Sequence, residues 1–309
     1  PNHILIEGDN LHALTALTFT HEGKIDVIYI DPPYNTGNKD FKYNDRFVDK
    51  EDSYRHSKWL SFMHKLLRIA KRLLSEKGVI FISIDENEIA EVKLLCNEIF
   101  NPINFVAQIT LLCNPKGRSQ DKYFNTCHEY CLVYSKSDLE PSHFSIAKSD
   151  DDIYSNYKLR DQVGYFRLLE LRNTHREFNR TNRPNLFYPI YVDPVNMKTS
   201  LQKDENYSIK VEPIWNDGFE GCWTWGKDLF IRENHLLVGT QKKGEWKIYR
   251  KSYSHSSDGS VVKKKLFTIW NDSSFFTERG QAMFGEIFPG FSKSDFPQPK
   301  SVDYIKQIL

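Results

Sequence analysis

The segment Ile25-Asp26-Val27-Ile28-Tyr29-Ile30 runs directly into Asp31-Pro32-Pro33-Tyr34-Asn35-Thr36-Gly37. Its first half is almost continuously apolar, which is typical of a strand buried on both faces of a parallel sheet. The two prolines have no backbone N–H, and each holds the residue before it in an extended conformation. The segment therefore predicts a buried strand that ends in a rigid loop, at the end of the sheet where ligands bind.

Short apolar strands and amphipathic helices alternate around this segment. Strands are expected at residues 4–6, 25–30, 78–85, 105–112 and 130–134. Helices are expected after Asn10, which serves as an N-cap, and at residues 59–74, 87–100 and 301–309. This alternation predicts an α/β fold, a doubly wound sheet of parallel strands with helices on both faces.

The alternation is lost near Ser135. We therefore expect a first domain at residues 1–135, an inserted α+β domain at 136–288 and a return to the first domain at 289–309. Within the insertion, residues 158–187 hold seven Lys or Arg against three Asp or Glu, and residues 241–265 hold eight against two. Trp and Tyr interleave with the second group, which suits phosphate contact and base stacking. A solvated protein surface is the alternative interpretation.

Composition excludes several classes of protein. Of 309 residues, 39% are hydrophobic and 14% aromatic, which is too apolar for a disordered chain. A mean hydropathy of −0.57 is too polar for a membrane protein, and a net charge of +1 limits any nucleic-acid surface to a local patch. Five cysteines without disulfide spacing and no secretory leader predict a cytoplasmic protein. A start at Pro1 indicates a piece of a longer chain, or a processed one.

The loop at Asp31 carries the clearest chemical signal. It offers two hydrogen-bond acceptors, the Asp31 carboxylate and the Pro32 carbonyl, beside the rigid ring of Tyr34. Two converging acceptors suit an exocyclic amino group with two N–H donors, and the ring suits a flat heterocycle. A nucleobase amine fits both features. The alternative is a proline-rich turn whose tyrosine packs on the core.

With Asp31-Pro32-Pro33-Tyr34, the chain resembles the amino-methyltransferases that modify adenine in DNA with S-adenosylmethionine, whose motif is [DNS]-P-P-[YFW]. The longer segment to Gly37 resembles the modification (Mod) subunits of type III restriction systems, within the beta group of the family. Further matches follow in the family's order at residues 59–63, 74–78, 128–136, 183–190, 223–226 and 299–303. The resemblance spans nearly the whole chain. It implies a Rossmann-like methyltransferase sheet with an inserted target-recognition domain.

The resemblance also implies catalytic roles. Asp31 and the Pro32 carbonyl, in a loop stiffened by Pro33, would accept hydrogen bonds from the adenine N6 amino group. Tyr34 would stack on the flipped base, and since stacking needs the ring alone, Tyr34→Phe is expected to be mild. An Asp rather than a Ser at position 31 favours adenine over cytosine. The implied function is site-specific methylation of adenine N6 in duplex DNA by base flipping, within a restriction-modification system.

Cofactor contacts are expected from Asp9, Asn10, Asp31, Lys300 and Ser301. A simple helix cap is the alternative at Asp9 and Asn10, and a solvated helix start is the alternative at Lys300 and Ser301. The family's F-x-G-x-G loop is absent from this sequence, and the beta-group order places it after Leu309. We therefore expect the 309-residue chain to bind S-adenosylmethionine poorly.

DNA contacts are expected from Asn35 and from basic residues of the insertion, namely Lys242, Lys243, Arg250, Lys251, Lys263, Lys264 and Lys265. The resemblance implies duplex DNA as substrate, a homodimer, a restriction (Res) subunit as a partner, no membrane and a bacterial cytoplasm.

No metal site is expected from sequence. Cys127, His128 and Cys131 lack the spacing of a structural zinc pair, and on a strand the two cysteines share one face, which indicates packing. Two other functions stay open. One is a non-catalytic DNA-recognition component, and the other is an amino-methyltransferase that acts on RNA or on a protein amide.

Overall fold

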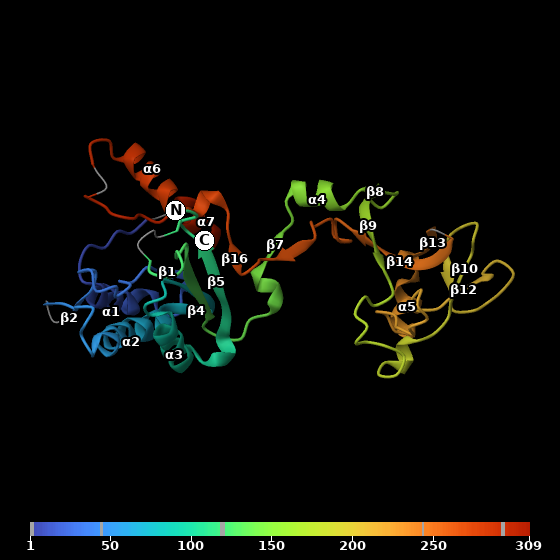
Figure 1. Ribbon diagram of the computed structural model, residues 1–309, viewed down its shortest axis with the longest axis horizontal. Coiled ribbons are helices and arrows are strands. Elements are labelled where there is room, and N and C mark those ends of the chain that lie inside the picture. The colour runs from blue at the N-terminus through green and yellow to red at the C-terminus, as the bar shows by residue number, and fades with distance from the viewer. Residues whose placement is uncertain (1–2, 44–45, 118–120, 243, 292–293) are drawn as a thin grey trace. The chain divides into compact units, whose positions relative to one another are not determined.

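A computed structural model describes residues 3–43, 46–117, 121–242, 244–291 and 294–309. The chain divides into two compact units (Figure 1). The first is Pro1–Phe144 with Leu266–Leu309, and the second is Ser145–Lys265. No helix in the described ranges combines the length and apolar character needed to cross a membrane.

The first unit alternates helices and strands, as its apolar periodicity predicts. Its elements in chain order are α1 (Asn10–His21), β1 (Ile25–Ile30), β2 (Lys42–Tyr43), β3 (Arg46–Phe47), α2 (Arg55–Leu73), β4 (Leu74–Ile84), α3 (Ile89–Phe100), β5 (Phe105–Leu112), β6 (His128–Ser135), β16 (Ile269–Trp270), α6 (Thr277–Ile287) and α7 (Val302–Ile308). Strands β1 and β5 have the predicted bounds.

The central sheet has the order β1-β4-β6-β5-β16 and is mixed. Strand β1 pairs parallel to β4, and β16 pairs parallel to β5, but β6 runs antiparallel to both of its neighbours. The prediction of an all-parallel sheet was therefore wrong for β6. Parallel pairing needs a crossover connection, and the described part of the chain between β5 and β6 contains no helix.

Helices cover both faces of this sheet, as predicted (Figure 1). On one face, Trp59 and Met63 of α2 and Phe100 of α3 pack against alternate residues of β4. On the other face, Tyr304 and Ile308 of α7 join a separate apolar cluster. Because successive side chains of a strand point to opposite faces, β4 contributes to both clusters. The result is the two-faced α/β layer expected for a Rossmann-like methyltransferase.

The start of the chain differs from its prediction. Residues 4–6 form no strand, and the side chains of Ile4 and Leu5 are 70% and 96% exposed. A strand needs a neighbour for its hydrogen bonds, and none pairs with this segment in the described structure. The N-cap of α1 is Asp9 rather than Asn10, because the Asp9 carboxylate accepts from the amides of Leu11 and His12.

The second unit is built from small antiparallel sheets. Its elements are β7 (Ser145–Ala147), α4 (Asp150–Asn156), β8 (Leu159–Arg160), β9 (Tyr165–Glu170), β10 (Ile190–Val192), β11 (Thr199–Ser200), β12 (Ile209–Val211), α5 (Lys227–Glu233), β13 (Leu237–Lys242), β14 (Glu245–Tyr253) and β15 (Lys263–Lys265). The sheets have the orders β13-β14-β9-β8, β11-β10-β12 and β15-β7. Trp223, Tyr188 and Phe230 lie in its core.

The unit borders differ from the predicted borders at 135/136 and 288/289. Ser135 ends β6 inside the first sheet, and the first unit continues to Phe144. Where the chain re-enters the first unit at Leu266, β16 pairs with β5, and the Trp270 ring packs against Tyr304 of α7. Residues 266–288 therefore belong to the first unit. A two-residue strand has no apolar period, so the sequence pattern does not reveal it.

Candidate active site

The ends of three strands bring the candidate residues together. Asp31 follows β1 directly, at the carboxyl end of a strand parallel to β4. Strand β6 is antiparallel to β4, and Tyr130 pairs with Ile84, the last residue of β4. The amino end of β6 therefore lies at the edge of the sheet where β1 and β4 end. This register places Glu129 beside the Asp31 loop.

The Asp31-Pro32-Pro33-Tyr34 loop is anchored from α2. Trp59, which is fully buried, donates its indole N–H to the Pro33 carbonyl at 2.7 Å. The Pro32 carbonyl has no donor among the described residues, so it stays free to accept a hydrogen bond. The prediction that this loop presents acceptors from a rigid backbone is consistent with this geometry.

Tyr34 is held at its hydroxyl group by a pair of charged side chains. The hydroxyl donates to Glu129 Oε2 at 3.0 Å and accepts from Lys300 Nζ at 2.6 Å. Lys300 also donates to the same Glu129 oxygen at 2.5 Å and lies 3.7 Å from Asp31 Oδ1. Residues from three distant parts of the sequence thus form one network, which we call the Tyr34 clamp: Asp31, Tyr34, Glu129 and Lys300.

Burial and neighbouring charges both shift the pKa values of the clamp residues. Burial raises the pKa of Asp31, against the opposing effects of Lys300 and the Tyr34 hydroxyl. Burial alone would lower the pKa of Lys300, but the neighbouring Glu129 and Asp31 carboxylates raise it overall. The pKa of Tyr34 is raised by burial and by Glu129. Lys300 is therefore a cation at neutral pH, and its charge is balanced by two carboxylates.

Lys300 is positioned by packing around the start of α7. The Ser301 hydroxyl caps α7 through the Asp303 amide and donates to the Ser274 carbonyl at 2.6 Å. Gly280 of α6 lies so close to the Pro299 and Lys300 carbonyls that a Cβ atom would collide with them. Ser301 is buried and its hydroxyl is already used. A cofactor contact from the Ser301 hydroxyl would have to replace one of these two hydrogen bonds.

Asp9 and Asn10, which were also predicted to contact the cofactor, take no part in the Tyr34 clamp. Asp9 uses its carboxylate to cap α1, and Asn10 is the exposed first residue of that helix. The helix-cap alternative describes Asp9 but not Asn10, and a cofactor contact from either residue stays a prediction. Asp31 and Lys300 are the two predicted cofactor residues that the fold brings together.

The residues predicted to contact DNA have different environments. Asn35 was predicted to contact DNA, but its side chain is fully buried and donates to Glu88, so it is not accessible to a DNA duplex. Lys251 pairs with Asp161 at 2.6 Å, and Lys264 pairs with Asp152. Lys242 lies 4.6 Å from the ring of Tyr249, and Arg250 lies 5.9 Å from the ring of Trp225. Lys243 lies outside the described residues.

Two of these ion pairs lower the pKa of their carboxyl groups well below the ordinary value. Against the opposing effect of burial, Lys251 and Tyr253 lower the pKa of Asp161 to about 2. Lys264 and Ser149 lower the pKa of Asp152 to about 2. Lys263 and Lys265 lie on the other face of β15 and are exposed. They are better placed than Lys264 for contacts with phosphate.

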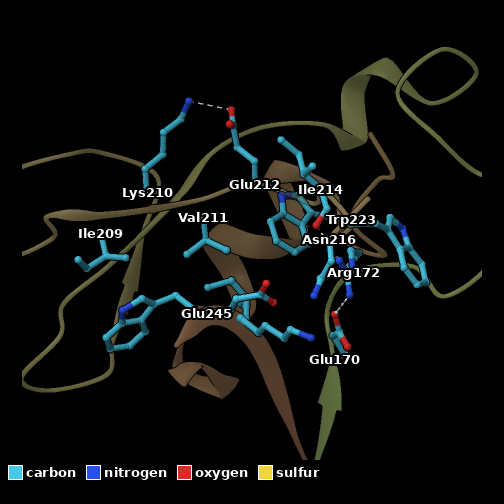
Figure 2. Close-up of a pocket in the computed structure, with 14 residues that line it drawn as sticks. Glu170, Arg172, Ile209, Lys210, Val211, Glu212, Ile214, Asn216, Trp223 and Glu245 are labelled. Carbon is cyan, nitrogen blue, oxygen red and sulfur yellow. Dashed lines mark hydrogen bonds and ion pairs between the residues drawn. The ribbon is translucent and has the colours of Figure 1, made fainter. Parts of the chain in front are cut away.

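A cavity of about 390 Å³ lies in the second unit (Figure 2). Two ion pairs lie in its lining, Arg172 with Glu170 at 2.7 Å and Lys210 with Glu212 at 2.9 Å. The Arg172 guanidinium also lies 4.3 Å from the Trp215 ring. Arginine in this part of the insertion therefore stabilises the unit internally, which the charge count alone does not reveal.

Comparison with known proteins identifies the family. A model described as DNA methylase, of the N6/N4 methyltransferase type, matches residues 25–309. The chain belongs to this family. The match begins at the first residue of β1 and runs through the second unit to the end of the chain.

Two relatives cover almost all of this methylase chain. The type II methyltransferase M.KpnI of Klebsiella pneumoniae is 36% identical over 98% of the chain, which spans 69% of that protein. The type III restriction-modification enzyme EcoPI Mod subunit of Escherichia phage P1 is 31% identical over 99% of the chain, which spans 51% of that protein. The resemblance to DNA methyltransferases and Mod subunits is confirmed.

Solved structures resemble the methylase chain only distantly. A putative DNA modification methylase of Thermus thermophilus, complexed with S-adenosyl-L-methionine, is 14% identical with a TM-score of 0.30 and covers 47% of this chain and 55% of that chain. The PvuII cytosine-N4-specific DNA methyltransferase is 12% identical with a TM-score of 0.33 and covers 45% and 50%.

Proposed function

We propose that this chain forms the base-binding and DNA-recognition part of a DNA methyltransferase that transfers a methyl group to the N6 amino group of adenine. One observation carries the proposal: the Asp31 carboxylate and the unpaired Pro32 carbonyl stand beside a tyrosine ring that Glu129 and Lys300 hold in place. Family membership supports methylation of an exocyclic base amine.

The amine needs help because its lone pair is delocalised into the base. Hydrogen bonds to Asp31 and the Pro32 carbonyl draw the nitrogen towards tetrahedral geometry and localise that pair. Such preorganised acceptors accelerate reactions by roughly 10²–10³-fold. Tyr34 stacks on the extrahelical base, and Asp31 takes up the proton that the amine loses. No covalent intermediate with the enzyme is needed.

S-adenosylmethionine is the methyl donor of the family and supplies an electrophilic methyl group when it is bound. The described residues fit the acceptor side of the reaction better than the donor side. Lys300 has the charge to bind the cofactor carboxylate, but Glu129 and Asp31 already neutralise it. Asp9 and Ser301 are engaged in helix caps. We propose two cofactor contacts, from Asp31 and from Lys300, and the Lys300 contact would have to compete with its two carboxylate partners.

The choice of base is tested by identifying the product. The chain, and any longer form of the protein, are incubated with S-adenosylmethionine and duplex DNA, and the digested nucleosides are separated by mass spectrometry. We expect N6-methyladenine. Recovery of N4-methylcytosine instead would show that an Asp at position 31 does not select adenine. Methylated RNA or protein, with unmodified DNA, would support the alternative substrates.

We propose that the second unit binds the duplex, with Lys263 and Lys265 on phosphate. The double change of these residues to Gln should weaken binding to all duplexes alike. It should also flatten the dependence of log K on log salt by about 0.9 for each phosphate interaction that is removed. The measurement is fluorescence anisotropy over a salt series, with Lys77→Gln as a control for loss of an exposed charge in the first unit. An unchanged slope would place the phosphate contacts elsewhere.

We also propose that two copies of the full protein assemble and that a restriction subunit joins them. The similarity to a protein named as a Mod subunit of a restriction-modification enzyme supports the second partner, and the two copies follow from the family resemblance alone. Light scattering after size exclusion measures the number of copies. Co-purification with a restriction subunit from the same genome tests the second partner, and a monomer that captures no such subunit would contradict both.

A further inference from the structure

A second polar cluster adjoins the Asp31 loop at Asn35 and shares no residue with the Tyr34 clamp. Its members are His56 in the first turn of α2, Glu88 at the N-cap position of α3, Glu91 in the first turn of α3, and Asn35 directly after Tyr34. One ligand atom from each of His56, Glu88 and Glu91 lies within 4.8 Å of the others. The methyl-transfer reaction uses none of these side chains.

This cluster contains buried oxygen atoms without partners. Glu88 and Asn35 are both fully buried. Glu88 Oε1 accepts from Asn35 Nδ2 at 2.5 Å and lies 2.8 Å from His56 Nδ1. Glu88 Oε2 and Asn35 Oδ1 have no hydrogen-bond partner in the described structure. Leaving a carboxylate oxygen and an amide oxygen buried and unpaired is costly, so a missing partner is indicated.

We propose that Glu88, Glu91 and His56, with the Asn35 amide oxygen, bind a divalent cation. Two carboxylates, an imidazole nitrogen and an amide oxygen form a set of hard and borderline ligands, typical of Mn²⁺ and Zn²⁺ sites. No thiol takes part. The His56 side chain is 40% exposed, which leaves a path from solvent to the ion. His56, Glu88 and Glu91 lie far from the cysteine-containing stretch at residues 127–131 and share no metal-ligand spacing, so the sequence alone does not indicate this site.

Arg55 lies beside His56 and should weaken binding of the cation. Its Nε donates to His56 Nε2 at 3.1 Å, so without an ion the His56 proton resides on Nδ1, facing Glu88. Binding through Nδ1 moves that proton to Nε2 and breaks the hydrogen bond with Arg55. The positive charge of Arg55 also repels the cation. Removing Arg55 should therefore tighten binding, whereas removing a carboxylate should weaken it.

The ion would tie three segments together: the loop after Tyr34, the start of α2 and the start of α3. Asn35 has a left-handed backbone conformation, with φ of 56°, and its amide group also donates to the Arg55 carbonyl. An ion on the Asn35 amide oxygen would hold this conformation beside the Tyr34 clamp. The inference does not depend on the proposed methyl transfer, because it concerns binding and stability.

The test uses the 309-residue chain after treatment with a chelator, with Mn²⁺ as the probe. Loss of the free Mn²⁺ signal in electron paramagnetic resonance measures binding, and thermal unfolding measures stabilisation. We expect one ion per chain, competition by Zn²⁺ and a higher midpoint of unfolding with Mn²⁺. Glu91→Gln and His56→Gln should each weaken binding by about tenfold or more. Arg55→Gln should strengthen it.

Glu98→Gln provides the matched control, since Glu98 is a carboxylate on the same helix as Glu91 but outside the cluster. It should bind Mn²⁺ like the original chain. Glu91 and His56 are only partly buried, and circular dichroism of each variant checks that it folds. Absence of Mn²⁺ and Zn²⁺ binding in the original chain would overturn the proposal. Equal affinity in the Glu91 and Glu98 variants would overturn it too.

Discussion

Asp31→Ala should abolish methyl transfer to duplex DNA by the full-length protein, with a loss of more than about 10³-fold in kcat. The variant removes one of two acceptors on the target amine together with the group that takes its proton. Transfer of tritiated methyl groups to DNA measures the effect. Near-normal activity in a folded variant would show that the Asp31 loop is only a turn.

Asp26→Ala is the matched control for this variant. Asp26 is an exposed carboxylate on β1, the strand that precedes Asp31, and it accepts from Ser75 at 2.8 Å, away from the clamp. It should retain activity. Asp31 must be ionised to accept the proton, and its pKa is raised above the ordinary value. Activity of the original protein should therefore be present above that raised pKa and be lost as the pH falls through it.

Tyr34→Ala should be the second most damaging change, because it removes the stacking surface for the base. Stacking on an aromatic ring contributes about 1–3 kcal/mol per base, so kcat/KM should fall by about 10–100-fold. The loss should be mainly in KM. The fluorescence of 2-aminopurine at the target position, which rises when the base leaves the stack, provides a direct readout of base capture.

The structure changes the expectation for Tyr34→Phe. From sequence, this variant was expected to be mild, but the hydroxyl joins Glu129 and Lys300. Its removal leaves the partly buried Glu129 carboxylate with Lys300 but with one donor fewer, and losing such a hydrogen bond costs about 1 kcal/mol. We expect an intermediate effect, smaller than that of Tyr34→Ala. Activity equal to that of the original protein would mean that the clamp does not position the ring.

Glu129→Gln separates a positioning role from a purely structural one. It removes a negative charge that raises the pKa of Asp31, and it frees Lys300 to pair more closely with Asp31. Both changes lower the pKa of Asp31. The acid limb of the pH profile should therefore move to lower pH while kcat falls. A fall in kcat with an unmoved acid limb would indicate damage to the fold instead.

Several features could be predicted from sequence because their causes are local. The apolar run at residues 25–30, followed by two prolines, defines β1 and its loop without help from the rest of the chain. Helical spacing of apolar residues likewise predicted α2 and α3, although α2 begins earlier, at Arg55. The acceptor groups of Asp31 and Pro32 follow from their covalent chemistry alone. The family resemblance rested on the same local segments.

Other features depend on which segments become neighbours. Glu129 reaches Tyr34 because β6 is antiparallel to β4; in the predicted parallel arrangement it would lie at the opposite edge of the sheet. Lys300 also contacts Tyr34, although it lies 266 positions later in the sequence. The burial of Asn35 against Glu88 and the internal pairing of Lys251 and Lys264 have the same origin. Residue type and local pattern determine which groups a strand or loop can offer. Strand direction and packing decide which of those groups meet, because electrostatic and hydrogen-bond interactions act over a few ångströms in space, regardless of separation along the chain.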